Sequence, residues 1–122
     1  MKKLVELAFF VDDVEANANF YRGLLGVEPV AQSEGMAILM SGDTKIFIHK
    51  KYTPGEGELP PENHLAFTVE DIDGECKNLT NQGIEIEVEP KDYYWGRSAY
   101  LRAPDGQLIE LIQEPKKTEG CA

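Results

Sequence analysis

The chain has 122 residues, of which 12 are Lys or Arg and 22 are Asp or Glu, so its formal net charge at pH 7 is −10. With 42% hydrophobic and 28% charged residues, it has the composition of a globular protein, and its length supports one compact domain. The acidity argues against binding to nucleic acid or to an anionic membrane, because both require a surplus of Lys and Arg.

The sequence shows no sign of a membrane or secretory segment. Its longest apolar run, Leu7–Val11, is far shorter than a bilayer span, and Glu6 and Asp12 interrupt the N-terminal stretch where a signal peptide would be apolar. Two cysteines, Cys76 and Cys121, form no disulfide framework. We therefore expect a cytoplasmic protein.

The sequence contains an internal repeat. Residues 6–15 (ELAFFVDDVE) align with residues 64–73 (HLAFTVEDID), 58 positions downstream, and five of the ten aligned residues are identical. Each copy then continues into a helical pattern that ends at a glycine, Gly26 or Gly83. The pattern indicates a duplicated unit.

In the first copy, about residues 1–51, the pattern predicts a strand, a helix and three short strands. The first strand covers 4–11, and Asp12 or Asp13 caps a helix that ends at Gly26. Shorter strands are expected at about 28–32, 36–40 and 45–49. The apolar face of the helix consists of Val14, Ala18, Tyr21 and Leu25.

A linker rich in Pro and Gly, residues 52–63, precedes the second copy at 64–113. There Asp71 is expected to cap a helix whose apolar stripe contains Cys76, which makes Cys76 a core residue rather than a nucleophile. Strands follow at about 84–89, 98–102 and 107–113, and residues 114–122 form a polar tail.

Strand alternation predicts which polar side chains of the repeat share a surface. Glu6 alternates with the apolar residues that face the helix, so it points to the opposite, concave side, and the repeat puts His64 at the equivalent position. Alternation in the last strand sends Glu110 to the same side. Two carboxylates and a neutral imidazole suit Mn, Fe, Co, Ni or Zn better than Ca, although each residue taken alone has ordinary structural roles.

Three stretches carry a resemblance to a known family: ELAFFVDDVEANANFYRGLLGV at 6–27, HLAFTVEDID at 64–73 and WGRSAYLRAPDGQLIELIQ at 95–113. They resemble the glyoxalase, bleomycin resistance protein and extradiol dioxygenase group, the vicinal oxygen chelate superfamily. The resemblance implies an α+β fold in which two tandem βαβββ modules form an open, curved mixed β-sheet barrel with the helices outside. It also implies a homodimer with a small-molecule ligand.

In the family's metalloenzymes, ligands begin the first strand of each copy and lie in the final strand. These positions correspond to Glu6, His64 and Glu110, and the resemblance makes Glu110 or Glu6 the catalytic proton carrier. A fourth ligand is often found where this chain has Phe47, which cannot bind a metal, and His49 on the same face is an alternative. The basic cluster that fosfomycin-modifying members need for a phosphonate is not found.

A second set of residues is predicted to contact the ligand. The aromatic stretch Tyr93–Trp95 is either a substrate contact or a loop packed at the barrel rim or a dimer seam, and Arg97 lies in the loop or on the face opposite Ser98. The residues expected to contact a substrate are Phe47, His49, Trp95, Tyr100 and Arg102.

Three functions fit the resemblance. The first is a metal-dependent lyase or isomerase of the glyoxalase I type, acting on a small substrate with neighbouring oxygens. The second is a metal-free protein that sequesters a cationic drug, as bleomycin resistance proteins do, and the net charge of −10 suits it. The third, an Fe(II) extradiol dioxygenase, ranks lowest because Glu6 replaces a His.

Overall fold

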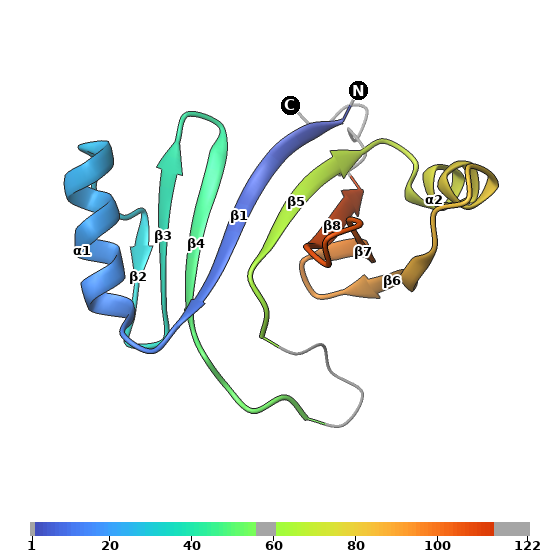
Figure 1. Cartoon of the computed structure of the whole chain (residues 1–122). Coiled ribbons are helices and arrows are strands. Elements are labelled where there is room, and N and C mark those ends of the chain that lie inside the picture. The colour runs from blue at the N-terminus through green and yellow to red at the C-terminus, as the bar shows by residue number, and fades with distance from the viewer. Residues whose placement is uncertain (1, 56–60, 114–122) are drawn as a thin grey trace. The chain divides into compact units, whose positions relative to one another are not determined.

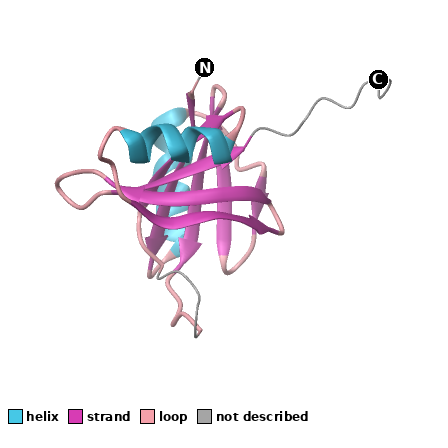
Figure 2. Ribbon diagram, turned by 90° about the vertical axis from the view of Figure 1, so that its right-hand side faces the viewer, coloured by secondary structure: helices cyan, strands magenta, loops and turns pink. Residues whose placement is uncertain are grey.

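The computed structural model of the chain describes residues 2–55 and 61–113 (Figure 1). The elements in chain order are β1 (Lys3–Val11), α1 (Val14–Leu25), β2 (Ala31–Gln32), β3 (Met36–Ser41), β4 (Thr44–Lys50), β5 (His64–Val69), α2 (Ile72–Asn81), β6 (Ile86–Tyr93), β7 (Gly96–Arg102) and β8 (Leu108–Gln113). Figure 2, in which strands are magenta and helices cyan, shows that strands make up the larger part of this structure.

The chain divides into two compact units, an N-terminal unit of Leu4–Ala66 and a C-terminal unit that runs from Phe67 onward and includes the first residues of the chain. The boundary falls within β5. Part of the expected linker, residues 56–60, and the expected polar tail, residues 114–122, lie outside the described residues. The assignment of the whole chain to one domain stays a prediction.

In the N-terminal unit, α1 packs on a mixed sheet, as Figure 1 shows. β1 pairs in parallel with β4, β4 pairs antiparallel with β3, and β3 pairs antiparallel with β2. Because alternate residues of a strand face opposite sides, the apolar members of β1 and β4 turn together toward the helix. The buried core is formed by Val14, Ala18, Ala37, Leu39, Ile46 and Ile48, with Leu7, Phe9, Val11, Tyr21 and Leu25 packed against it.

Both ends of α1 follow local capping rules. The side chain of Asp13, not Asp12, accepts a hydrogen bond from the Ala16 N–H at 2.9 Å and satisfies a first-turn donor. The helix ends at Gly26, whose φ of 68° is left-handed and whose N–H donates to the Arg22 carbonyl at 2.9 Å. The predicted start and stop of this helix are thus confirmed.

In the C-terminal unit, β7 pairs antiparallel with both β6 and β8, and α2 packs against these strands. Asp71 caps α2, as expected, by accepting from the Gly74 N–H at 3.2 Å. Ile72 and Cys76 are buried in the core of this unit, so the prediction that Cys76 is a core residue is confirmed. The other core members are Val69, Ala99, Leu101 and Leu111.

The predicted α+β class, a repeated βαβββ order with mixed strand pairing, is confirmed, but two strands differ from the expected bounds. β2 is limited to Ala31–Gln32, since Pro29 lacks the N–H that a ladder needs. β6 begins later than expected and continues past Pro90 to Tyr93, because a change of register between Val88 and Lys91 takes up the proline.

Neither α1 nor α2 combines the length and the apolar character that crossing a bilayer requires.

Alanine substitutions at Gly23 in α1 and at Gly26, the residue that ends it, are expected to change the stability of the protein in opposite directions. Gly26→Ala should destabilise the protein by about 1 kcal/mol, because an alanine is strained at its positive φ although nothing blocks the added carbon. Gly23→Ala, inside the helix and equally unobstructed, should stabilise it by about 0.5–1 kcal/mol. Urea unfolding measures both, and a shift of the same sign in the two variants would contradict the assigned helix end.

Candidate functional site

Glu6 and His64 lie side by side in the N-terminal unit. Glu6 is in β1 and His64 is the first residue of β5, and their side chains are only 16% and 12% exposed. The Glu6 Oε2 and His64 Nε2 atoms are 3.9 Å apart. Leu7 and Phe9 of β1 pack against the core on the side of α1. Strand alternation therefore turns Glu6 to the face away from the helix, as the sequence predicted.

The imidazole of His64 is oriented by the residues before it. Its Nδ1 atom lies 2.9 Å from the Glu62 carbonyl oxygen, which can only accept, so Nδ1 carries a proton and donates it. In the neutral ring, Nε2 then presents a lone pair toward the Glu6 carboxylate. Two acceptors facing each other at 3.9 Å suit a cation between them, and the bond to a carbonyl is the usual support for a metal-binding His.

The strand β1 is tied to the segment that carries His64. The Phe10 N–H donates to the Asn63 side-chain oxygen at 2.8 Å, one residue before the imidazole. On its other side, the Glu6 carboxylate has Lys45 Nζ at 3.7 Å from Oε1, but Lys45 is 42% exposed and a pair of this length in solvent contributes little. The hydrogen bond from Phe10 to Asn63 therefore fixes the backbone of β1 against the segment that carries His64.

Aromatic rings continue the surface that carries His64. Phe10 contacts His64 at 6.2 Å between ring centroids, and it also contacts His49 at 5.6 Å and Tyr52 at 6.1 Å. Phe47 lies 5.6 Å from His49. We call Phe10, Phe47, His49 and Tyr52 the aromatic cluster. Since none of them is buried, the cluster offers an apolar face beside the Glu6–His64 pair.

Glu110 lies on β8 in the C-terminal unit, where it is only 3% exposed. Its Oε2 atom accepts a hydrogen bond from the Ser98 hydroxyl at 2.9 Å, and the Trp95 indole N–H donates to the same serine oxygen at 3.0 Å. The alternation predicted for β8 is confirmed, since Ile109 and Leu111 pack into the core of this unit.

The aromatic stretch forms the tip of the β6–β7 hairpin, where Tyr93 pairs with Gly96. The Tyr93 and Trp95 rings stack at 4.4 Å with 5° between their planes, and Tyr93 meets Tyr100 edge-on at 6.3 Å. Burial raises the pKa of the Tyr93 phenol, and the charge of Glu110 raises it further. The phenol therefore stays neutral, next to the carboxylate, across the physiological range.

Arg97 anchors the hairpin to α2 on the face opposite Ser98, which is one of the two positions expected for it. Its Nε and Nη2 atoms donate to the two carboxylate oxygens of Asp73 at 3.0 and 2.8 Å, and Nη1 donates to Asp92 at 3.1 Å. Hydrogen bonds from Arg97 lower the pKa of Asp73, and those to Asp73 and Asp92 raise the pKa of Arg97.

The predicted substrate residues have different surroundings. Phe47 and His49 lie in the aromatic cluster, and Tyr100 is opposite Glu110 in the strand register and only 4% exposed. Trp95 is 44% exposed at the hairpin tip. Arg102 is engaged elsewhere, because its guanidinium donates to Glu87 and to the Gly106 carbonyl, both at 2.9 Å.

The comparisons with known proteins identify the family of the chain. Residues 3–111 match the model of the Glyoxalase/Bleomycin resistance protein/Dioxygenase superfamily. The chain belongs to this superfamily. A solved structure, hypothetical protein BH1468 from Bacillus halodurans, superimposes with a TM-score of 0.74 at 21% identity and covers 98% of this chain and 99% of its own, which shows the shared fold.

Two named relatives lie within the superfamily. The chain is 30% identical over 117 residues to the glutathione transferase FosA of Serratia marcescens, covering 91% of this chain and 80% of that protein. It is 28% identical over 123 residues to a probable lactoylglutathione lyase of Vibrio cholerae, covering 90% and 89%. The two relatives have different names for their activities, so superfamily membership alone does not assign one.

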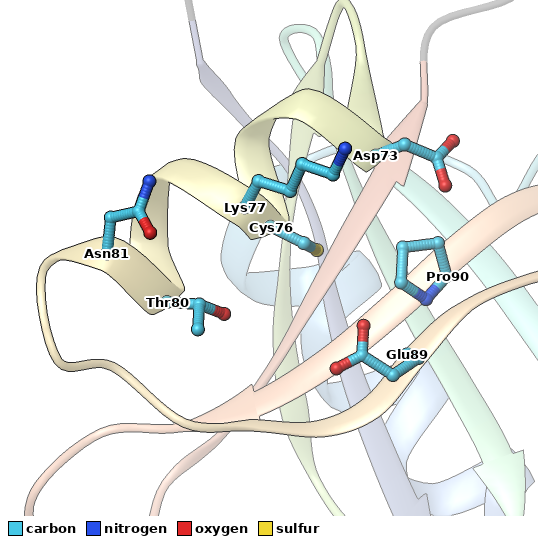
Figure 3. A pocket seen from close by; sticks show the side chains of 7 residues that line it. All are labelled: Asp73, Cys76, Lys77, Thr80, Asn81, Glu89 and Pro90. Atoms are coloured by element: carbon cyan, nitrogen blue, oxygen red, sulfur yellow. The ribbon is translucent and has the colours of Figure 1, made fainter.

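A pocket of about 300 Å³ lies between α2 and β6 of this superfamily member (Figure 3). Its lining carries both charge signs, with Asp73 and Lys77 on α2 and Glu89 on the facing β6, and the buried Cys76 points toward it. Burial, and then the charges of Glu89, Asp73 and Glu75, raise the pKa of the Cys76 thiol. The thiol stays protonated at neutral pH, so this pocket lacks an activated nucleophile.

Sequence reasoning missed the contacts that support these side chains. The sequence assigns no role to Ser98, because its partner Glu110 is two residues away from Ile112, the residue opposite Ser98 in the strand register. A diagonal pair on neighbouring antiparallel strands is detectable only once the register is known. The orientation of His64 by the Glu62 carbonyl leaves no signal in the side-chain sequence at all.

The Arg97–Asp73 contact predicts a pH-dependent stability. Because the native pKa of Asp73 is lowered, its contribution to stability is present above the ordinary aspartate value of about 3.9 and is lost as the pH falls through the native pKa. Asp73→Asn should therefore lower the melting temperature at pH 7, and the gap to wild type should narrow toward pH 3. Asp43→Asn, in the exposed β3–β4 turn, is the matched control and should show no such trend.

Proposed function

We propose that the protein is a metal-dependent lyase or isomerase of the glyoxalase type that acts on a small substrate with neighbouring oxygens. The observation that carries the proposal is the Glu6–His64 pair, in which a largely buried carboxylate faces Nε2 of an imidazole whose Nδ1 proton is already bound to the Glu62 carbonyl. Such a nitrogen is prepared to bind a metal rather than to donate a hydrogen bond.

We assign Glu110 as the third ligand. The support is the repeat, which relates Glu6 to His64, and the alternation of β8, which turns Glu110 away from the residues that pack in the core of its unit. Two carboxylates and a neutral imidazole balance a divalent charge, and this nitrogen and oxygen donor set suits Ni, Zn, Co, Mn or Fe. Such a metal, when bound, supplies Lewis-acid polarisation of substrate oxygens.

The chain's own residues supply proton transfer and orientation in this proposal. Glu110 or Glu6 accepts a proton from a substrate carbon and returns it to a neighbouring atom, as a general base and then a general acid. Phe47 and His49 of the aromatic cluster bind the less polar part of the substrate and keep water from it. Tyr100, Trp95 and Arg102 stay candidate contacts, Arg102 only if its bond to Glu87 opens.

A metal-free binding protein resembling bleomycin resistance proteins is the second candidate. It is favoured by Tyr94 and Trp95, which are 98% and 44% exposed at the hairpin tip, together with the net charge of −10, since exposed rings and acidic surface attract a cationic planar drug. The homodimer, the cytoplasmic location and His49 as a fourth ligand stay predictions from the sequence.

Metal content tests the first candidate. Elemental analysis of untagged protein should find about one divalent metal per chain, and Glu6→Gln, His64→Ala and Glu110→Gln should each weaken binding of added Ni²⁺, Zn²⁺, Co²⁺ or Mn²⁺. We expect at least about a 100-fold loss by titration calorimetry, because losing an outer-shell partner alone costs about 10- to 100-fold.

The same proteins should be assayed for lactoylglutathione lyase and glutathione transferase activity, the names of two relatives, with chelator as a further arm. Glu34→Gln, an exposed carboxylate in a loop, is the control and should behave as wild type. Native protein that binds none of these metals would refute the proposal. Salt-sensitive binding of a cationic glycopeptide that survives chelator would then favour the drug-binding candidate.

The aromatic cluster makes a separate prediction once a substrate is found. Phe47→Ala should raise KM by about 5- to 10-fold with little change in kcat, since it removes apolar contact that ground state and transition state share. Phe20→Ala, at a ring on α1 that is 61% exposed, removes a similar side chain and should leave KM unchanged. Equal effects of the two substitutions would argue against a substrate contact at the cluster.

A further inference from the structure

Three side chains of the C-terminal unit form a hydrogen-bonded series with a fixed direction. The Trp95 indole can only donate, and its Nε1–H lies 3.0 Å from Ser98 Oγ. An ionised Glu110 can only accept, and its Oε2 lies 2.9 Å from the same oxygen. The Ser98 hydroxyl must therefore accept from the indole and donate its one proton to the carboxylate.

The middle member of the series is sealed from water. Ser98 is 0% exposed and Glu110 is 3% exposed, so water does not replace either bond when it breaks. Hydrogen bonds in such surroundings polarise one another, and an unmet buried acceptor is costly. The serine proton is thus held on one oxygen of the carboxylate and restricts its rotation.

The outer member is held from two sides. The indole stacks on Tyr93 at 4.4 Å, and the strand beside it is fixed to α2 by the bidentate bond from Arg97 to Asp73. Trp95 is nevertheless 44% exposed, so one part of the ring meets the solvent and the other meets Ser98. The series connects the surface of the hairpin tip to a buried carboxylate.

We propose that Ser98 is a positioning residue that orients the Glu110 carboxylate for its role as a ligand and links that carboxylate to the indole of Trp95. The inference depends on the proposed function, because it gives Glu110 the ligand role assigned there. The link works in both directions. A cation bound at Glu110 weakens the hydrogen bond from Ser98 and so changes the surroundings of the indole. A contact at the hairpin tip, in turn, changes the orientation of the carboxylate.

The sole tryptophan of the chain makes the link measurable, because all indole emission comes from Trp95. Zn²⁺ is the probe, since it is closed-shell and has no redox chemistry. Saturation with Zn²⁺ should shift the emission of wild-type protein and leave that of Ser98→Ala nearly unchanged. Titration calorimetry on the same samples should show a Zn²⁺ affinity about 10- to 100-fold lower in Ser98→Ala.

A metal-free cycle tests the link without any ligand. Glu110→Gln should alter the Trp95 emission in the wild-type background and alter it much less in the Ser98→Ala background. If Ser98 did not link the two residues, the effects of the two substitutions on the emission would simply add. Trp95→Phe, which keeps the Ser98–Glu110 bond, should lose less Zn²⁺ affinity than Ser98→Ala. Ser41→Ala, at the exposed end of β3, is the matched serine control and should leave affinity and emission unchanged.

The outcomes separate the two proposals. Wild-type protein that binds Zn²⁺ without any change in Trp95 emission, or a Ser98→Ala variant with wild-type affinity, would overturn the link while leaving the proposed metal site intact. Wild-type protein that binds no divalent metal would overturn both. Additive emission changes in the metal-free cycle would overturn the link by themselves, and circular dichroism of each variant confirms that the fold is retained.

Discussion

The two-residue alternation of the strands is the constraint on which the rest of the structure depends. Each apolar side chain that β1 or β8 turns toward a helix obliges the next residue to face the other way. That obligation places Glu6 and Glu110 away from the helices of their units. A shift of one residue in either strand would exchange a core leucine for a carboxylate, so the energy of the core also protects the register of the site.

Burial sets the chemistry of these carboxylates. A polar group that is 3% exposed needs hydrogen-bond partners within the protein, and the Ser98 hydroxyl donates one hydrogen bond to Glu110. His64 likewise has a supporting hydrogen bond, from its Nδ1–H to the Glu62 carbonyl oxygen. In both cases the neighbouring group fixes the orientation of the side chain, so in the proposed metal site the supporting groups matter as much as the proposed ligands.

The repeat and the alternation predict the βαβββ order, the end of α1 at Gly26, the Asp71 cap and the faces of Glu6 and Glu110, because each follows from local periodicity. What failed was non-local. The passage of β6 across Pro90 requires a change of register with β7, and the Ser98–Glu110 contact requires knowing which residues of two strands are opposite. The Arg102–Glu87 hydrogen bond between neighbouring strands also requires the register, and the prediction that Arg102 contacts a substrate stays a prediction.

The irregular strand β6 affects the tendency of this protein to aggregate at high concentration. Among the described strands of its unit, β6 pairs with β7 alone, and an unpaired strand edge is a template for joining other chains. Pro90 removes one backbone donor from β6, and the changes of register with β7 make the strand irregular. The exposed charges of Glu87, Glu89 and Lys91 add repulsion and hydration, so the edge resists sheet-to-sheet aggregation.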